Sequence, residues 1–390
     1  ALRCAGEKRA DLNGSSTGVF VGIQVGEFGT LPNKPAPGPY TATGGRAAIA
    51  SNRVSYALGL EGPSMSVDTA CSSALVALQA ASHSLRSGGG AAAVVAAVNV
   101  LVSAAGFVGT CSAHMLSPMG RCHTFDALAD GYARAEGSCA VVAQDTASRI
   151  EESMHGVILL ETVAVNQDGR TASLTAPNGP AQQRVIASAI EQAATVLPLV
   201  ECHGTGTALG DPIEVSAQRA VLGAGRRPTL PLVTGAVKSN LGHLEAGAGL
   251  VGVLKLVLSL QRGQASANLH LQRLNPHIDV VGYAVVLPTE THAMVPRMEA
   301  TNAGVSSFGF GGTNSHAVLG AEGSRMTRLS KEQPAVQYAR AAFAWWDVAA
   351  RDAAERPYLG EATGIRTAGI LAFEYYAPNL SCAVANIELF

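Results

Sequence analysis

The chain has 390 residues, a net charge of −2, 47% hydrophobic residues and only 14% charged residues. This balance predicts a large buried core, and it argues against a disordered chain and against nucleic acid or an anionic membrane as the main partner. The seven cysteines are odd in number and lack paired spacing, which argues against a disulfide framework and a zinc site. We therefore expect a reducing compartment such as the cytoplasm, and no bound metal.

Strand-like and helix-like segments alternate along the chain as far as Leu319. This alternation predicts an α/β layered fold. The continuously apolar run AAAVVAAVNVLV predicts a sheet that is covered on both faces. The expected strands are 18–23, 92–102, 156–165, 233–236 and 300–307, and the expected helices are 72–86, 180–194, 212–222 and 245–261.

The stretch VDTACSSAL, from Val67, places Cys71 between a short strand and a helix. Its small neighbours leave room for a substrate to reach the sulfur. A helix start also supplies N–H groups and partial positive charge, which favour the reactive thiolate. For a lone cysteine, an inert buried thiol is the more common interpretation.

A second motif, ECHGTGTALGDPIE, places His203 at the end of an apolar strand, before a glycine-rich loop. Asp211, Pro212 and Glu214 predict a helix start, with an N-cap residue and a capping-box carboxylate. The glycines fit neither a dinucleotide-binding turn nor a phosphate-binding P-loop.

Two further motifs add polar groups. VKSNLGHLEAGAGL contains Lys238 and His243 before a buried helix, and SSFGFGGTNSH predicts a tight turn that presents backbone N–H groups. Each motif alone has an ordinary structural interpretation. Together they supply a nucleophile, two imidazoles, a lysine and a possible oxyanion hole, a combination that indicates acyl transfer through a thioester.

Two segments of the chain are alike. CSSALVALQAASHSLRSG and HLEAGAGLVGVLKLVLSLQRG both run from a reactive residue through small residues into an aliphatic helix that ends at glycine. Two half-domains with one architecture would explain the likeness, and so would a chance similarity between two buried helices.

The four motifs have the order and spacing of β-ketoacyl synthases, and the chain most resembles the ketosynthase domain of modular polyketide synthases. SPMGRCHTFDALADGYARAEG and NQDGRTASLTAPNGPAQQ support the resemblance, which covers about Asp11 to Leu319. It implies an α/β, thiolase-like fold of two similar βαβαβαββ halves in α-β-α-β-α layers, here without its first strand. It also implies a homodimer, with the strand at 92–102 in the interface.

The resemblance implies a decarboxylative Claisen condensation that extends a polyketide chain. Cys71 would carry the acyl chain, and His203 and His243 would hydrogen-bond the thioester oxygen of a malonyl-type extender. The backbone N–H groups of Cys71 and Phe310 would hold the oxyanion.

The resemblance further implies supporting and substrate-binding residues. Lys238 would pair with Glu214 and tune His243, and the substrate-binding residues would be Thr205, Thr207, Asn240, Gly311 and Gly312.

The expected partners are an acyl carrier protein, which brings its own phosphopantetheine, and other synthase domains. No cofactor bound by this chain is implied. Two alternatives remain: a non-catalytic ketosynthase-like module that binds carriers or acts as a scaffold, and a fatty-acid-type ketosynthase.

We expect three regions in the chain: an N-terminally incomplete ketosynthase domain at 1–319, a linker at 320–367, and the possible start of another thiolase-fold domain at 368–390. The last expectation rests on AGILAFEYYAPNL, which is similar to the start of 3-hydroxy-3-methylglutaryl synthases.

Overall fold

A computed structural model describes residues 1–2, 5, 7–24, 26–27, 38–145, 158–294, 300–322 and 386–389. All of them belong to one unit, Ala1–Thr327 together with Ala383–Phe390. The expected linker, apart from 320–322, and the part of the expected second domain before residue 386 lie outside the described residues.

The helices and strands follow one another much as the sequence predicts. The helices are α1 (Arg9–Leu12), α2 (Thr41–Gly44), α3 (Ala48–Leu58), α4 (Ser73–Arg86), α5 (Ala104–Ser112), α6 (Gly179–Ala193), α7 (Gly210–Leu222), α8 (Lys238–Leu241), the 3-10 turn η3 (Glu245–Gly247) and α9 (Ala248–Arg262). The strands are β1 (Gly18–Gly22), β2 (Ser64–Val67), β3 (Ala92–Asn99), β4 (Gly137–Asp145), β5 (Ile158–Gln167), β6 (Leu199–Glu201), β7 (Leu232–Gly235), β8 (Gln264–Ala265), β9 (Val285–Val286), β10 (His292–Ala293), β11 (Ala300–Phe308), β12 (Thr313–Glu322) and β13 (Asn386–Leu389).

The main sheet contains two groups of strands built alike. Its order is β2-β1-β3-β4-β13-β5-β12-β11-β6-β7-β9. In the first group β2, β1 and β3 are parallel and β4 is antiparallel to β3. In the second group β7, β6 and β11 are parallel and β12 is antiparallel to β11. The second group therefore repeats the first, which supports the half-domain interpretation of the two similar segments.

The two groups differ where they meet. In the second group β5 borders β12 and runs antiparallel to it. The matching place beside β4 is occupied by β13, which runs parallel to both β4 and β5. Residues Asn386–Leu389 thus occupy the place in the first group that corresponds to that of β5 in the second.

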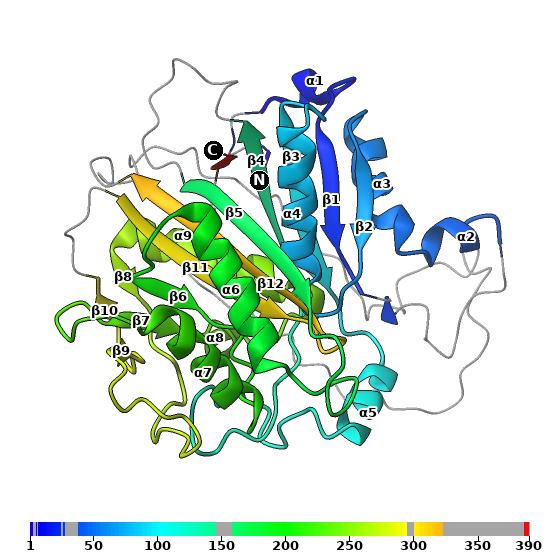
Figure 1. Cartoon of the computed structure of the whole chain (residues 1–390). Coiled ribbons are helices and arrows are strands. Elements are labelled where there is room, and N and C mark those ends of the chain that lie inside the picture. Colours follow the sequence, from blue (N-terminus) through cyan, green and yellow to red (C-terminus); the bar gives the residue numbers. More distant parts are fainter. Residues whose placement is uncertain are drawn as a thin grey trace, which may run out of the picture. The chain divides into compact units, whose positions relative to one another are not determined.

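The helices form layers with the two strand groups. Helices α4 and α9 pack against each other and against strands of both groups, whereas α3 packs on β1 and β2, and α6 packs on β5, β12 and α7. Figure 1 shows α4 lying along the strands of the first group. The arrangement matches the expected α-β-α-β-α order of a thiolase-like fold.

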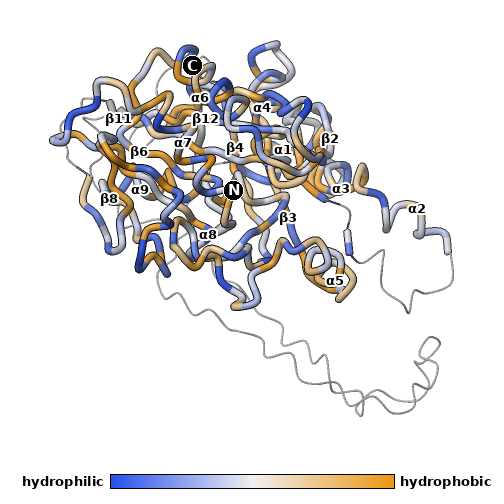
Figure 2. Tube along the Cα trace, turned by 60° about the horizontal axis from the view of Figure 1, so that its bottom comes forward, coloured by the Kyte–Doolittle hydropathy of each residue, from blue (hydrophilic) through white to orange (hydrophobic). Residues whose placement is uncertain are grey.

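The largest core cluster lies around α4 and α9. Leu75, Leu78, Leu250 and Leu256 are completely or almost completely buried there, and burial of each such side chain contributes roughly 1.5–3 kcal/mol. A Cβ on Gly249 would lie 2.6 Å from Cγ of Leu75, so the missing side chain lets the two helices approach closely. The hydropathy colouring in Figure 2 shows hydrophobic residues concentrated in the strands and these central helices.

The observed bounds differ from the predicted bounds mainly at strand ends. The run predicted as a strand to Val102 stops pairing at Asn99, because its last residues lead into α5. Among the described residues, no helix has the length and hydropathy needed to cross a membrane.

Candidate active site

Cys71 lies in a tight turn between β2 and α4, as the sequence predicts. The preceding residue, Ala70, has φ 57°, a left-handed conformation that costs a non-glycine residue about 1 kcal/mol or more. Two side chains hold this turn: Asp68 accepts the N–H of Ala70 at 3.0 Å, and Ser73 donates to its carbonyl at 2.6 Å. Ser307 on β11 donates to the carbonyl of Cys71 at 2.7 Å. The candidate nucleophile is therefore held by contacts from both halves of the fold.

Cys71, His203 and His243 converge as predicted. Their ligand atoms all lie within 4.8 Å of one another, and Nε2 of His243 is 3.1 Å from Sγ of Cys71. The two imidazole rings meet edge to face, with centroids 5.6 Å apart. Residues separated by 172 positions along the chain thus form one cluster.

The cluster opens into a cavity of about 1050 Å³. Its wall includes Thr205 and Thr207, as expected for substrate-binding residues, and Phe310 beside Cys71. Asn240, Gly311 and Gly312 do not occur among the residues that line it. Asn240 instead donates to the carbonyl of Ala267 at 3.3 Å.

The thiol of Cys71 is less acidic than its place before a helix suggests. Burial raises its pKa to about 11, although Lys238 and the backbone N–H groups of Phe310 and Cys71 lower it. The helix start was expected to lower this pKa; the backbone N–H groups do act in that direction, but desolvation outweighs them, so the net shift is upward. The resemblance implies an oxyanion hole made of the same two N–H groups, and that role stays a prediction.

The surroundings of both histidines favour the neutral imidazole. Burial lowers the pKa of His203 and of His243 well below the usual value, and the Lys238 cation lowers both further. Nδ1 of His243 accepts the backbone N–H of Glu245 at 3.0 Å, and Nδ1 of His203 faces the Lys238 ammonium at 3.4 Å. In each ring Nδ1 is the acceptor, so Nε2 carries the proton and can donate it.

Lys238 does not form the expected ion pair with Glu214. Its Nζ donates to the carbonyl of His203 at 2.5 Å and lies against the imidazole of the same residue, not that of His243. The Glu214 carboxylate instead accepts the backbone N–H groups of His203 at 2.7 Å and Gly204 at 2.8 Å. Burial raises the pKa of Glu214 to about 7.

The sequence predicted that Asp211 and Glu214 cap their own helix, but they do not. Helix α7 has Leu209 at its N-cap, with no side-chain cap. The Asp211 carboxylate accepts the N–H groups of Phe125 at 2.8 Å and Gly206 at 3.1 Å. The two acids therefore satisfy buried backbone N–H groups at His203, Gly204, Gly206 and Phe125, which would be costly to leave without acceptors.

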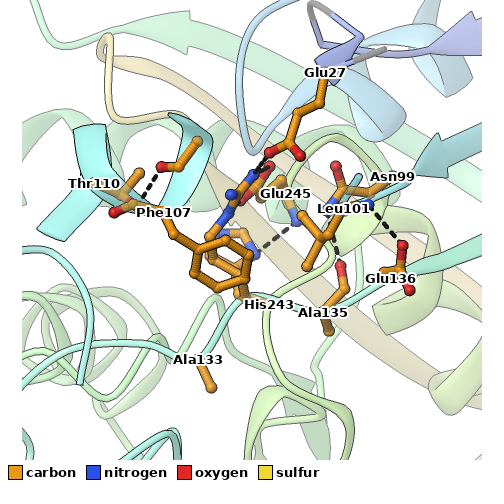
Figure 3. A network of polar contacts seen from close by, with 12 residues as sticks. Glu27, Asn99, Leu101, Phe107, Thr110, Ala133, Ala135, Glu136, His243 and Glu245 are labelled. Atoms are coloured by element: carbon orange, nitrogen blue, oxygen red, sulfur yellow. Dashed lines mark hydrogen bonds and ion pairs between the residues drawn. The ribbon is translucent and has the colours of Figure 1, made fainter. Parts of the chain in front are cut away.

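Several residues near His243 were missed by sequence reasoning. The ring of Tyr132 packs edge to face on His243 at 4.8 Å between centroids. Arg134 forms ion pairs with Glu27 and Glu245, and these two acids are labelled with His243 in Figure 3. The available signal was Arg134 itself, a charged residue inside the otherwise uncharged run GYARA.

Three converging ligand atoms could also hold a metal ion. The Lys238 ammonium beside His203 opposes a dication there. Both Nδ1 atoms already have partners, and the Nε2 protons would have to leave before the rings could bind a metal through that nitrogen. The set fits proton donation better than metal binding, and the absence of a metal stays a prediction.

Comparison with known proteins identifies the family. Models of the "Beta-ketoacyl synthase, N-terminal domain" and "Beta-ketoacyl synthase, C-terminal domain" match residues 1–147 and 157–272. The chain is 44% identical over 325 residues to erythronolide synthase EryA3 of Saccharopolyspora erythraea, covering 82% of this chain and 10% of that protein. It is also 41% identical over 313 residues to the spectinabilin polyketide synthase system protein NorA of Streptomyces orinoci, covering 79% of this chain and 16% of that protein.

Solved structures show the same fold. The ketosynthase from module 6 of the bacillaene synthase of Bacillus subtilis 168 superposes with a TM-score of 0.73 at 33% identity, over 81% of this chain and 56% of that chain. The oxazolomycin ketosynthase domain OzmH KS7 of Streptomyces albus JA3453 gives a TM-score of 0.74 at 33% identity, over 82% of this chain and 58% of that one. The chain thus spans a small part of the curated relatives and just over half of these solved chains.

Proposed function

The chain belongs to the β-ketoacyl synthase family, and we propose that it catalyses the decarboxylative condensation of a Cys71-bound acyl chain with a malonyl-type extender. One observation carries the proposal: a buried thiol lies beside two imidazoles whose neutral form is favoured and whose Nδ1 atoms accept hydrogen bonds, so that Nε2 carries the proton, and all three residues line a large cavity. A thiol nucleophile alone would serve acyl transfer. Two proton donors suit an enolate oxygen.

In the first step, the Cys71 sulfur attacks the thioester carbonyl of an acyl carrier. The sulfur loses its proton and forms the new thioester, and the carrier thiolate leaves and takes up a proton. Because the pKa of Cys71 is about 11, the thiolate is a minor species at neutral pH. The nearby Nε2–H of His243 stabilises the sulfur as negative charge develops.

In the second step, the extender loses its carboxyl group as carbon dioxide, and the electron pair of the broken C–C bond forms an enolate. The Nε2–H groups of His203 and His243 donate to the enolate oxygen. The carbon then attacks the acyl-Cys71 carbonyl. The carbonyl oxygen becomes an oxyanion, which the N–H groups of Cys71 and Phe310 stabilise. The C–S bond then breaks, the Cys71 thiolate leaves and takes up a proton, and the β-keto product departs on its carrier.

We further propose the partners and setting that this chemistry needs. The extender and acyl chain arrive on an acyl carrier protein, whose phosphopantetheine enters past Thr205 and Thr207. The chain works as a homodimer with other synthase domains in the cytoplasm, and it binds no cofactor of its own. Identity to polyketide synthases favours polyketide over fatty-acid extension.

Intact-protein mass after incubation with an acyl-pantetheine thioester tests the first step. We expect a mass gain of one acyl group in the wild type and none in Cys71→Ala. Carbon dioxide release from malonyl carrier protein then tests the second, with His203→Ala as the control. A folded wild type that neither gains mass nor releases carbon dioxide would favour the non-catalytic carrier-binding alternative.

A further inference from the structure

The backbone around Arg134 pairs directly with His243. The N–H of His243 donates to the carbonyl of Ala133 at 2.7 Å, and the N–H of Ala135 donates to the carbonyl of His243 at 2.9 Å. Arg134 lies between the two residues that make these bonds, so its backbone is held beside that of the catalytic histidine.

The Arg134 side chain bridges two carboxylates. Its Nε and Nη2 donate to the two carboxylate oxygens of Glu245, the second at 3.1 Å, and Nη2 also donates to Glu27 at 2.7 Å. The three side chains are only 5%, 10% and 11% exposed, in the order Arg134, Glu245, Glu27. We refer to these three residues as the Arg134 network (Figure 3). Buried charges of this kind are costly unless each has its partner, so loss of Arg134 would disturb both acids.

Glu245 connects the network to the chemistry of His243. Its backbone N–H is the donor that makes Nδ1 of His243 an acceptor. Glu245 has φ 48°, a left-handed conformation that is unfavourable for a non-glycine residue. The bidentate contact with Arg134 supports this conformation, and it keeps the N–H directed at the ring.

Glu27 connects the network to the cavity wall. One of its carboxylate oxygens accepts the N–H groups of Val102 at 2.9 Å and Ser103 at 2.8 Å, immediately before α5. The ring of Phe107 on α5 lies 4.7 Å from the Arg134 guanidinium. Ala105, Gly106 and Thr110 of the same helix line the cavity. A single guanidinium therefore joins the cavity wall to the catalytic loop.

We propose that Arg134 is a positioning residue for the condensation. Through Glu245 it holds the His243 ring in its Nε2–H form, and through Glu27 it fixes the position of α5, which forms one wall of the cavity at Cys71. The proposal rests on the function proposed above. It adds that the geometry of the acyl cavity and the proton-donating form of His243 depend on one shared ion-pair network.

Several charged or titratable groups face His243, and the Arg134 network sets the balance among them. They are Cys71 from the β2–α4 turn, His203 from the loop after β6, Lys238 from α8, Tyr132 and Arg134 from the segment before β4, and Glu245 from η3. With Arg134→Met, the Glu245 carboxylate would lose its counter-charge beside His243, and the pKa of His243 would rise.

The test uses the whole chain with ¹⁵N-labelled histidine. Long-range ¹H–¹⁵N spectra report the tautomer and protonation of His243 without substrate, and His243→Asn identifies its signals. We expect the wild type to keep the neutral Nε2–H form from pH 5.5 to 8. Arg134→Met should show mixed tautomers and a protonated fraction in this range, and Arg134→Lys should restore part of the wild-type spectrum.

Glu136→Gln is the matched control, because Glu136 lies on the same segment and accepts the N–H of Leu101 but does not contact His243. A second variant covers the case in which Arg134→Met does not fold. A Cβ at Gly106 would lie 2.1 Å from Oε1 of Glu27 and 2.5 Å from Nη1 of Arg134, so Gly106→Ala displaces the network while keeping its charges. It should also give mixed His243 tautomers.

Activity provides a separate readout. In Arg134→Met we expect kcat for malonyl decarboxylation to fall about 10- to 100-fold, with KM changed less than threefold. Folded Arg134→Met and Gly106→Ala proteins with wild-type His243 spectra would overturn the proposal. A wild type that releases no carbon dioxide, but whose His243 tautomer changes with Arg134, would overturn the proposed function and leave the positioning role supported.

Discussion

Lys238 contacts His203 and not Glu214: its Nζ lies 3.4 Å from Nδ1 and 2.5 Å from the carbonyl oxygen of that histidine. The Lys238 ammonium therefore faces Nδ1 of His203 as a donor, just as the backbone N–H of Glu245 donates to Nδ1 of His243. Each imidazole has a donor at Nδ1, and both present Nε2–H to the cavity side of the cluster. The two histidines are therefore alike in protonation, although their donors differ.

Loss of this ammonium should affect decarboxylation more than acylation. In Lys238→Met, His203 loses the donor that fixes its tautomer, so carbon dioxide release from malonyl carrier should fall about 10- to 100-fold. Acylation of Cys71, followed by intact mass, should fall less. Lys8→Met, an exposed change, serves as the control. Equal losses in both steps would mean that Lys238 acts through the thiol and not through His203.

The reactivity of Cys71 should rise with pH well into the alkaline range. Burial raises its pKa to about 11, so the rate of carboxamidomethylation by iodoacetamide, measured by peptide mass, should still increase between pH 8 and pH 10. Because Lys238 lowers this pKa, Lys238→Met should react more slowly than the wild type at each pH. A plateau near pH 7 would show instead that the helix start outweighs burial.

Glu214 should make the fold more stable at mildly acidic pH. Burial raises its pKa from 4.5 to about 7, so the folded state binds the proton more tightly than the unfolded state does. Its contribution is fully present below pH 4.5 and is lost as pH rises through about 7. Neutral buried histidines oppose this trend, because the lowered pKa of His203 and His243 reduces stability as pH falls below their unfolded pKa of about 6.5.

The effect of Glu214 can be separated from that of the histidines by comparing the free energy of unfolding of the wild type with that of Glu214→Gln. Urea unfolding of the wild type and Glu214→Gln at pH 5 and pH 7.5 isolates the carboxyl group. The wild-type advantage in free energy of unfolding should be larger at pH 5 by about 2 kcal/mol. An advantage that does not change with pH would contradict the raised pKa.

Gly22 should tolerate no side chain. A Cβ there would lie 2.8 Å from N and 2.9 Å from Cα of Ala74, which are backbone atoms at the start of α4. Gly22→Ala should therefore lower the free energy of unfolding by about 2 kcal/mol or more and slow acylation of Cys71. Gly109→Ala, in α5 with nothing within 4 Å, should leave both quantities nearly unchanged. Similar losses in the two variants would argue against this close approach.

Chelation should leave the chemistry intact. Since the Nε2 protons and Lys238 both oppose a dication at the cluster, dialysis against EDTA should change the rate of decarboxylation less than twofold. Loss of activity on dialysis, restored by a metal ion, would overturn the metal-free assignment.

The sequence alone predicted the order of the helices and strands and the candidate catalytic trio, and it left the likeness of the two halves open between a repeat and chance. The hydrophobic periodicity that predicts helices and strands depends only on residues close together in the chain. Likewise, Cys71, His203 and His243 each lie in a short motif whose glycines and small residues indicate a functional loop. The glycine turn was found in the same way, whereas the role of Phe310 came from the resemblance. Local patterns carry this information because the residues that shape a turn are adjacent in the chain.

The tertiary structure decided which polar groups are partners and which are charged. The Asp211 and Glu214 pattern predicts caps, yet their carboxylates hold backbone N–H groups of the buried loops at Phe125 and His203. Burial, which depends on the whole fold, raised the pKa of Cys71 where its helix position suggested a fall. Arg134 meets Glu27 and Glu245 from 107 and 111 positions away, and no local pattern could indicate such contacts, because desolvation and long-range ion pairs exist only after the chain has folded.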